Sequence, residues 1–176
     1  MRLTVAALLA ALSCGAFADD AKPDPWQPVR FLVGTWKGTA AGEPGTGTVE
    51  RTYQFILNDR FIEERNTSTY APSERNTQGE VHHHLGILSY DRKRKALMLR
   101  QFHEESFVNL YALNPALGSA SKRVFESESF ENFDNAWKAR ETYDVISSDE
   151  FIETFELAPP GKPFEVYSRN HFKRVR

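Results

Sequence analysis

Short runs in which apolar and polar residues alternate occupy most of the chain after residue 34, and they constrain its fold more than any other feature. A period of two is typical of β-strands that have one buried and one exposed face. Segments rich in Gly, Pro, Asn, Asp and Ser separate the runs and are mostly of hairpin length. About ten strands and little helix are therefore predicted, at residues 34–41, 48–57, 60–70, 79–90, 96–104, 107–113, 123–130, 137–146, 151–157 and 164–176.

Evenly spaced strands with short connections are typical of an up-and-down antiparallel barrel or a sandwich. The 176 residues suit one domain. Closure into a barrel removes the exposed sheet edges, and a barrel of eight to ten strands has room for one small ligand. We therefore expect residues 31–176 to form a single all-β domain, an antiparallel up-and-down β-barrel of about ten strands.

The first 18 residues have the pattern of an export signal. Arg2 precedes a short apolar run over residues 3–12, and Ala16-Phe17-Ala18 is a small-x-small cleavage site. That run is too short to span a bilayer, and no longer apolar run follows it. We expect a signal peptide over 1–18, a polar N-terminal tether over 19–30, a periplasmic or secreted location and no transmembrane segment.

Cys14 is the only cysteine and lies within this export signal. The residues around it, Leu12-Ser13-Cys14-Gly15, loosely resemble a bacterial lipobox, so a lipid anchor at Cys14 is the alternative to cleavage after Ala18. Cleavage would leave a mature chain without a disulfide or a thiolate metal ligand. The core, with 12% aromatic residues in the whole sequence, would then hold the domain together.

The overall charge narrows the choice of partners. A formal net charge of −2 argues against nucleic acid, which basic surfaces bind. The glycine-rich segment 42–47 is followed by neither a Lys-Ser/Thr pair nor a helix, so we expect a turn there and not a phosphate-binding loop.

A tryptophan follows closely on a glycine at the start of the first predicted strand, in Gly34-Thr35-Trp36. The glycine lets backbones approach closely where the strand bends, and the indole is a large apolar plug with one N–H donor. This opening resembles that of the calycin superfamily, which includes lipocalins, fatty-acid-binding proteins and nitrobindins. The resemblance implies that a basic residue of the last strand stacks on Trp36, for which Arg169 and Arg174 are candidates. Such a contact contributes roughly 0.5–2 kcal/mol and is structural.

Within that superfamily, the stretch from Gly34 to Gly38 looks most like nitrobindin-type haem-binding barrels, which carry Gly-Thr-Trp-x-Gly. The segments Leu99-Arg-Gln-Phe-His103 and Phe164-Glu-Val-Tyr-Ser-Arg169 also resemble those of exported bacterial relatives. In nitrobindins a histidine close to the C-terminus ligates the haem iron. The resemblance therefore implies haem as a cofactor, with His171 as its ligand.

Three further histidines invite a metal interpretation. His82 and His84 share one face of a predicted strand, and His83 lies on the other. Counting across the turn at 91–95 places His82 or His84 roughly opposite His103. Three interpretations remain at this point: a metal or haem site, a polar lining of the cavity, or solvated histidines on the outer face.

Large apolar residues on one face of the strands are expected to line the barrel interior, together with polar residues of the same parity. The cavity-lining candidates are Tyr53, Phe55, Leu99, Gln101, His103, Tyr111, Glu141 and Tyr143. Polar groups in such a cavity must pair with one another, with water or with a ligand. They orient a ligand in an apolar pocket, or they form a structural ion-pair network.

The expected function is that of an exported protein that holds one small hydrophobic or amphipathic molecule inside the barrel. The first alternative is haem binding through His171. The second is a barrel enzyme with a His–Glu acid–base pair, for instance His103 with Glu141. No Gly-x-Ser-x-Gly elbow and no ready carboxylate dyad supports catalysis, and an interaction module with a filled barrel is a further class.

Overall fold

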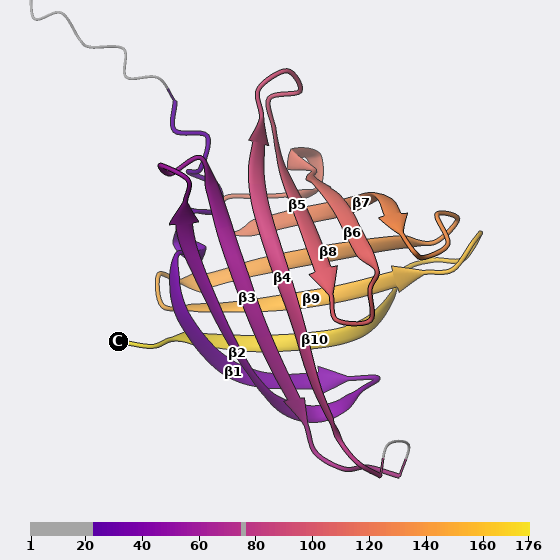
Figure 1. The fold of residues 1–176 in the computed structure, drawn as a ribbon. Coiled ribbons are helices and arrows are strands. Elements are labelled where there is room, and N and C mark those ends of the chain that lie inside the picture. Colours follow the sequence, from indigo (N-terminus) through magenta and orange to yellow (C-terminus); the bar gives the residue numbers. More distant parts are fainter. Residues whose placement is uncertain (1–22, 75–76) are drawn as a thin grey trace, which may run out of the picture.

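The chain folds into a closed antiparallel barrel in which every strand pairs with its sequence neighbours and the last strand returns to the first (Figure 1). The structure is a computed structural model that describes residues 23–74 and 77–176. Its ten strands are β1 (Gly34–Gly42), β2 (Gly45–Ile56), β3 (Phe61–Tyr70), β4 (Glu80–Asp91), β5 (Ala96–His103), β6 (Val108–Leu113), β7 (Lys122–Glu131), β8 (Lys138–Ser147), β9 (Glu150–Ala158) and β10 (Glu165–Arg174). The predicted all-β, up-and-down barrel is confirmed.

Helix is confined to two short 3-10 turns among the described residues, η1 (Arg30–Leu32) and η2 (Pro115–Leu117). Neither has the length or the apolar character that a membrane crossing by a helix requires. The predicted signal peptide and Cys14 lie outside the described residues.

The alternation of the sequence becomes an inner and an outer face of the barrel wall. In Figure 1 the purple-to-pink strands β2–β5 cross in front of the orange and yellow strands β7–β10, and the interior lies between them. The half of the interior near η1 is filled by large buried apolar side chains. Its largest members are Trp36, Tyr53, Tyr111, Tyr143, Phe125, Phe151, Phe172, Leu32, Ile62, Leu88 and Leu99.

Trp36 plugs this filled end of the barrel. Its side chain is completely buried, and its Nε1–H donates to the carbonyl of Leu32 at 2.6 Å. The ring also packs edge-to-face on Phe151, with centroids 4.7 Å apart. The single polar atom of the indole is therefore satisfied while the rest of the ring fills apolar space.

The indole is covered by Arg174, whose guanidinium carbon lies 4.2 Å from the ring centroid. The same guanidinium donates to the carbonyls of Val33 and Phe31 at 2.7 Å each, and to that of Ser148. Gly34 has a φ of +133°, and a Cβ there would lie 2.4 Å from Arg174 Nη1. The glycine before the tryptophan therefore makes room for the cation that seals the barrel.

The last part of the predicted tether lies against the barrel. Trp26 and Val29 are buried, and Trp26 packs edge-to-face on Phe55 with centroids 5.7 Å apart. Apolar residues at positions 26, 29 and 32 turn toward the filled end through η1 and the turn before it. The apolar residues of this segment therefore cover the filled end of the barrel from outside.

The contact of Arg174 with the indole of Trp36 gives a stability prediction. Arg174→Ala should lower the free energy of unfolding by roughly 2–4 kcal/mol, because it removes a partly desolvated cation–π contact and charged hydrogen bonds to three carbonyls. The matched control is Arg169→Ala, since Arg169 lies on the outer face of the same strand. That variant should stay within about 0.5 kcal/mol of the wild type in urea unfolding. Equal effects of the two substitutions would contradict a special role for Arg174.

Candidate functional site

The other half of the barrel interior holds a cavity of about 400 Å³. It opens between the hairpins at the end opposite Trp36, where Pro44, Glu80, Glu105 and Tyr167 lie around its mouth. Aromatic and aliphatic side chains form part of its wall, namely Phe107, Phe130, Phe133, Phe155 and Leu157. Its deeper lining is polar, so the cavity combines an apolar entrance with a polar floor.

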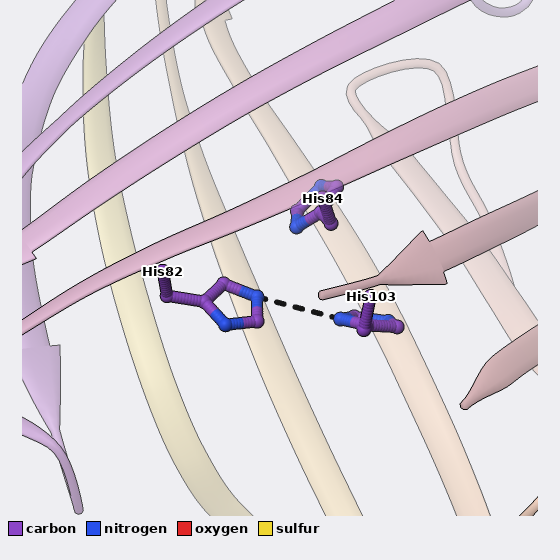
Figure 2. Close-up of side chains that lie close together, drawn as sticks. All are labelled: His82, His84 and His103. Carbon is purple, nitrogen blue, oxygen red and sulfur yellow. Dashed lines mark hydrogen bonds between the residues drawn. The ribbon is translucent and has the colours of Figure 1, made fainter. Parts of the chain in front are cut away.

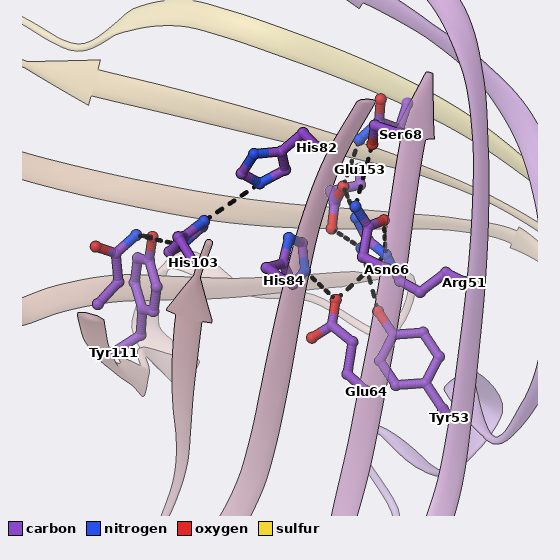
Figure 3. A network of polar contacts seen from close by, with 12 residues as sticks. Arg51, Tyr53, Glu64, Asn66, Ser68, His82, His84, His103, Tyr111 and Glu153 are labelled. Atoms are coloured by element: carbon purple, nitrogen blue, oxygen red, sulfur yellow. Dashed lines mark hydrogen bonds and ion pairs between the residues drawn. The ribbon is translucent and has the colours of Figure 1, made fainter. Parts of the chain in front are cut away.

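A buried arginine organises the floor (Figure 3). Arg51 forms ion pairs with Glu153 and, at 3.2 Å, with Glu64, and its Nε–H donates to Asn66 Oδ1 at 2.9 Å. Burial opposes the charge, but Glu153, Tyr53 and Glu64 outweigh it, so the pKa of Arg51 lies well above its ordinary value. The guanidinium is held as a fixed cation between two carboxylates.

Two of the buried glutamates, Glu64 and Glu141, differ in charge. Burial alone would raise the pKa of Glu64, but Arg51 and His84 outweigh burial and lower this pKa to about 2. Burial and the neighbouring Glu153 raise the pKa of Glu141 well above its usual range, and Gln101 hydrogen-bonds to it. Glu64 is therefore ionised at neutral pH, and Glu141 is held toward its neutral form.

Buried oxygens without a hydrogen-bond partner surround this network. Among the described residues they number five: Glu64 Oε2, Gln101 Oε1, Asn109 Oδ1, Glu141 Oε2 and Asn170 Oδ1. The amide oxygens of Gln101, Asn109 and Asn170 line the cavity and accept hydrogen bonds without donating them. The neutral carboxyl of Glu141 lines it too but can also donate a hydrogen bond, and Glu64 is not part of the lining. An unpaired buried acceptor costs about 1–3 kcal/mol, so this set is a region that a donor-bearing ligand would stabilise.

Three histidines form the part of the lining next to this region (Figure 2). His84 of β4 pairs directly with His103 of β5, and one ring nitrogen from each of His82, His84 and His103 lies within 4.8 Å of the others. His82 Nε2 and His103 Nδ1 are 3.4 Å apart. These histidines line the cavity, so they are not the solvated outer-face set that was one of the three interpretations; only His83 of this run points outward into solvent.

The environment of His103 keeps its ring neutral. The ring stacks on Phe107 with centroids 4.2 Å apart, and its Nε2 lies 3.3 Å from Asn109 Nδ2. Burial, together with His84 and His82, lowers the pKa of His103 to about 3. A neutral imidazole in a sheltered position is suited to hydrogen bonding or metal binding.

The eight predicted cavity residues fall into two groups. Gln101, His103 and Glu141 line the cavity. The remaining five belong to the packed core: Tyr53, Leu99, Tyr111 and Tyr143 are buried in it, and Phe55 is partly buried near Trp26. The prediction had the correct strand face but did not separate the filled half from the hollow half.

Two residues that the family resemblance singled out lie outside the barrel. Asn170 and Phe172 point inward, which turns His171 outward; its side chain is 42% exposed and its Nε2 bonds Glu150 Oε1 at 2.6 Å. Arg169 lies on the same outer face and does not cover Trp36. The expected haem ligand His171 is therefore corrected: strand parity places it away from the cavity.

The His103–Glu141 pair, the example given for the enzyme alternative, is not formed. The ring nitrogens of His103 contact His82 and Asn109, while the hydrogen bond of Glu141 goes to Gln101. Both side chains line the same cavity, but each has other neighbours.

Sequence reasoning missed most of the charged floor. The missed residues are Arg51, Glu64, Glu153, Asn109 and Asn170. A signal for four of them was present, because each lies two residues from a buried aromatic on the same strand. Arg51 is two residues from Tyr53, Glu153 from Phe151, Asn109 from Tyr111 and Asn170 from Phe172. Same-face spacing predicts that such a polar residue shares the interior with its aromatic neighbour.

Comparison with known proteins supports the fold and goes no further. No family model and no curated protein matches the chain. Among solved structures it resembles Rv2717c from M. tuberculosis, with a TM-score of 0.62 at 16% identity over 88% of this chain and 99% of that one. A redesigned β-barrel, b11L5F_LGL, matches with a TM-score of 0.39 at 14% identity, covering 83% and 93% of the two chains. The likeness to the M. tuberculosis protein shows the barrel fold alone.

The buried network gives a second prediction. Arg51→Met should destabilise the protein by about 3–5 kcal/mol, because it leaves two buried carboxylates without their cation. Arg65→Met is the control, since Arg65 makes a comparable bidentate pair with Glu63 on the outer face, at 2.8 and 3.0 Å. Loss of that exposed pair should cost less than about 1 kcal/mol in chemical denaturation. A mild effect of Arg51→Met would show that the floor is not held by this ion network.

Proposed function

We propose that the protein is an exported carrier that binds one small amphipathic molecule inside the barrel, with its apolar part at the aromatic mouth and a hydrogen-bond-donating head on the polar floor. The observation that carries this proposal is the cavity of about 400 Å³ with unpartnered buried oxygens at its inner end. Small-molecule pockets are typically about 300–1,000 Å³, mostly apolar, with a few polar groups that fix orientation.

The entrance suits the apolar part of such a ligand. Phe107, Phe130 and Phe133 line one side of it, and their rings contact one another, with centroid distances of 6.2 Å for Phe107–Phe133 and 5.5 Å for Phe130–Phe133. Phe155 and Tyr167 line it as well, in edge-to-face contact at 5.7 Å. Burial of an aliphatic chain against these rings would supply most of the binding free energy.

The floor selects against an anionic head. Glu64 and Glu153 share the single guanidinium of Arg51, so their charges exceed the one that neutralises them. Glu80 and Glu105 add carboxylates at the mouth. An amine or an alcohol would satisfy the acceptors, whereas a carboxylate would meet like charge and more acceptors. The proposed ligand class therefore differs from simple fatty acids.

The two alternatives from the sequence receive less support. Haem binding through His171 would require that residue inside the barrel, and it lies outside, bonded to Glu150. An acid–base mechanism through His103 and Glu141 would require the two groups to act on one reacting atom, and their hydrogen bonds go to other residues.

Ligand competition tests the proposal. Protein treated with EDTA is loaded with the neutral fluorescent probe N-phenyl-1-naphthylamine, which dodecylamine, dodecanol and dodecanoate then displace. Dodecylamine and dodecanol should compete at concentrations at least about tenfold lower than dodecanoate, which corresponds to about 1.4 kcal/mol. No uptake of any of these molecules would overturn the carrier function. Tighter binding of dodecanoate would overturn the donor-head assignment.

A pair of glutamine variants locates the head. Gln101→Leu removes one of the unpartnered acceptors in the cavity, and dodecylamine affinity should fall by roughly 2- to 10-fold, the worth of one hydrogen bond. Gln54→Leu is the control, since Gln54 bonds Glu63 on the exposed face and should leave the affinity unchanged. Equal affinities in both variants would place the head elsewhere.

A further inference from the structure

We infer that His82, His84 and His103 form a binding site for one divalent transition-metal ion of the Zn²⁺ type on the wall of the cavity. Each of the three contributes one ring nitrogen, and these nitrogens lie within 4.8 Å of one another. A set of three imidazole nitrogens binds Zn²⁺ and similar transition-metal ions in preference to harder cations. The site does not depend on the proposed carrier function, and a separate measurement tests it.

The strand arrangement brings the three rings together. His82 and His84 are two residues apart on β4 and so share its inner face, and His84 lies directly opposite His103 on β5. Opposite residues of an antiparallel pair have Cβ atoms roughly 5 Å apart. The pairing of two hairpin strands therefore fixes all three side chains on one patch, without any contribution from a flexible loop.

The distances are close to those of a bound ion. At Zn–N bonds of about 2.0–2.1 Å and tetrahedral angles, two nitrogen ligands are about 3.3 Å apart. His82 Nε2 and His103 Nδ1 are 3.4 Å apart, and the centroids of the three rings are separated by 5.3–5.8 Å. A small rotation of the His84 ring would complete a three-nitrogen set, and the remaining coordination position would face the cavity.

Each ring is also held from its far side. Glu105 Oε1 lies 2.9 Å from His82 Nδ1, and Glu64 Oε1 lies 3.0 Å from His84 Nε2. Asn109 lies 3.3 Å from His103 Nε2, and a half-turn of its amide would bring the unpartnered Oδ1 to that nitrogen as an acceptor. Carboxylate or carbonyl oxygens on the outer nitrogens are the usual partners of metal-ligating histidines, since they fix the ring and its tautomer.

The charge of the cavity favours a cation at this place. The carboxylates of Glu64 and Glu153 share one guanidinium, and Glu64 Oε2 is buried without a partner. A divalent ion would offset this excess of negative charge. A water molecule on its open position would be a strong donor, and donors are what the unpartnered oxygens of the cavity need.

Metal titration tests the site in the absence of any organic ligand. Tag-free protein treated with EDTA should bind one equivalent of Zn²⁺ by calorimetry, and Co²⁺ should give the visible absorption of a four-coordinate site. His84→Ala and His103→Ala should each weaken binding by more than about 100-fold, because even outer-shell partners contribute 10- to 100-fold. No saturable binding by the wild type would overturn the inference.

The chain offers two matched controls. His83 lies between two proposed ligands on the outer face of the same strand, and His171 lies on the outer face of β10. His83→Ala and His171→Ala should bind Zn²⁺ within about threefold of the wild type, since neither ring reaches the cavity. A loss in these variants equal to that in His84→Ala would show surface binding and overturn the site.

A second acidic set shares His82 and must be distinguished from the site. Glu80, His82 and Glu105 also offer ligand atoms within 4.8 Å of one another at the mouth. If an ion bound there, Glu80→Gln would abolish binding and His103→Ala would not, which overturns the three-histidine assignment. X-ray absorption of the Zn²⁺-loaded wild type gives a readout that needs no variant to fold: three imidazoles support the site, and fewer overturn it.

Discussion

The interior of this barrel depends on the compensation of one buried guanidinium. Arg51 pairs in register with Trp36 on the neighbouring strand and lies 4.8 Å over the ring of Phe172, so it stands where the apolar filling ends. Glu64 approaches it from the neighbouring strand β3, and Glu153 approaches it from β9, far away in the sequence. Replacing one member of this buried group by an apolar side chain would leave charge unpaired, so the apolar filling stops at these residues. The polar layer therefore ends the core and begins the cavity.

This division explains how a barrel with so many unsatisfied groups can remain stable. Each unpaired buried oxygen of the floor costs free energy, and the filled half offsets that cost. In that half Phe151 packs edge-to-face on Trp36 and stacks on Phe172, with ring centroids 4.7 Å apart in both pairs. Arg174 covers this half from outside. The packing of the filled end therefore offsets the cost of the polar groups without hydrogen-bond partners at the other end.

Sequence reasoning recovers the strands because the period of two is local, and each turn between them carries its own residue signals. It also places either His82 or His84 opposite His103, because a single short hairpin connects the strands and register can be counted across it; the partner is His84. It does not decide which face of β3 is inside, since both faces carry polar residues. Glu64 is buried and Glu63 bonds Arg65 outside, a choice that the neighbouring strands make.

A family resemblance also does not decide which way a side chain points from a strand, as His171 shows. Its distance from the C-terminus suits an interior ligand, but on a strand a shift of one residue reverses the direction of the side chain. β10 has an irregularity in its pairing between Val166 and Ser168, after which Ser168, Asn170 and Phe172 alternate inward. The residues that seal and fill the barrel, Phe172 above all, therefore exclude His171 from it. The most apolar residues of a strand decide which of its faces lies inside the barrel. The histidines that can contact a ligand in the cavity are therefore the ones on an inner face, His82, His84 and His103.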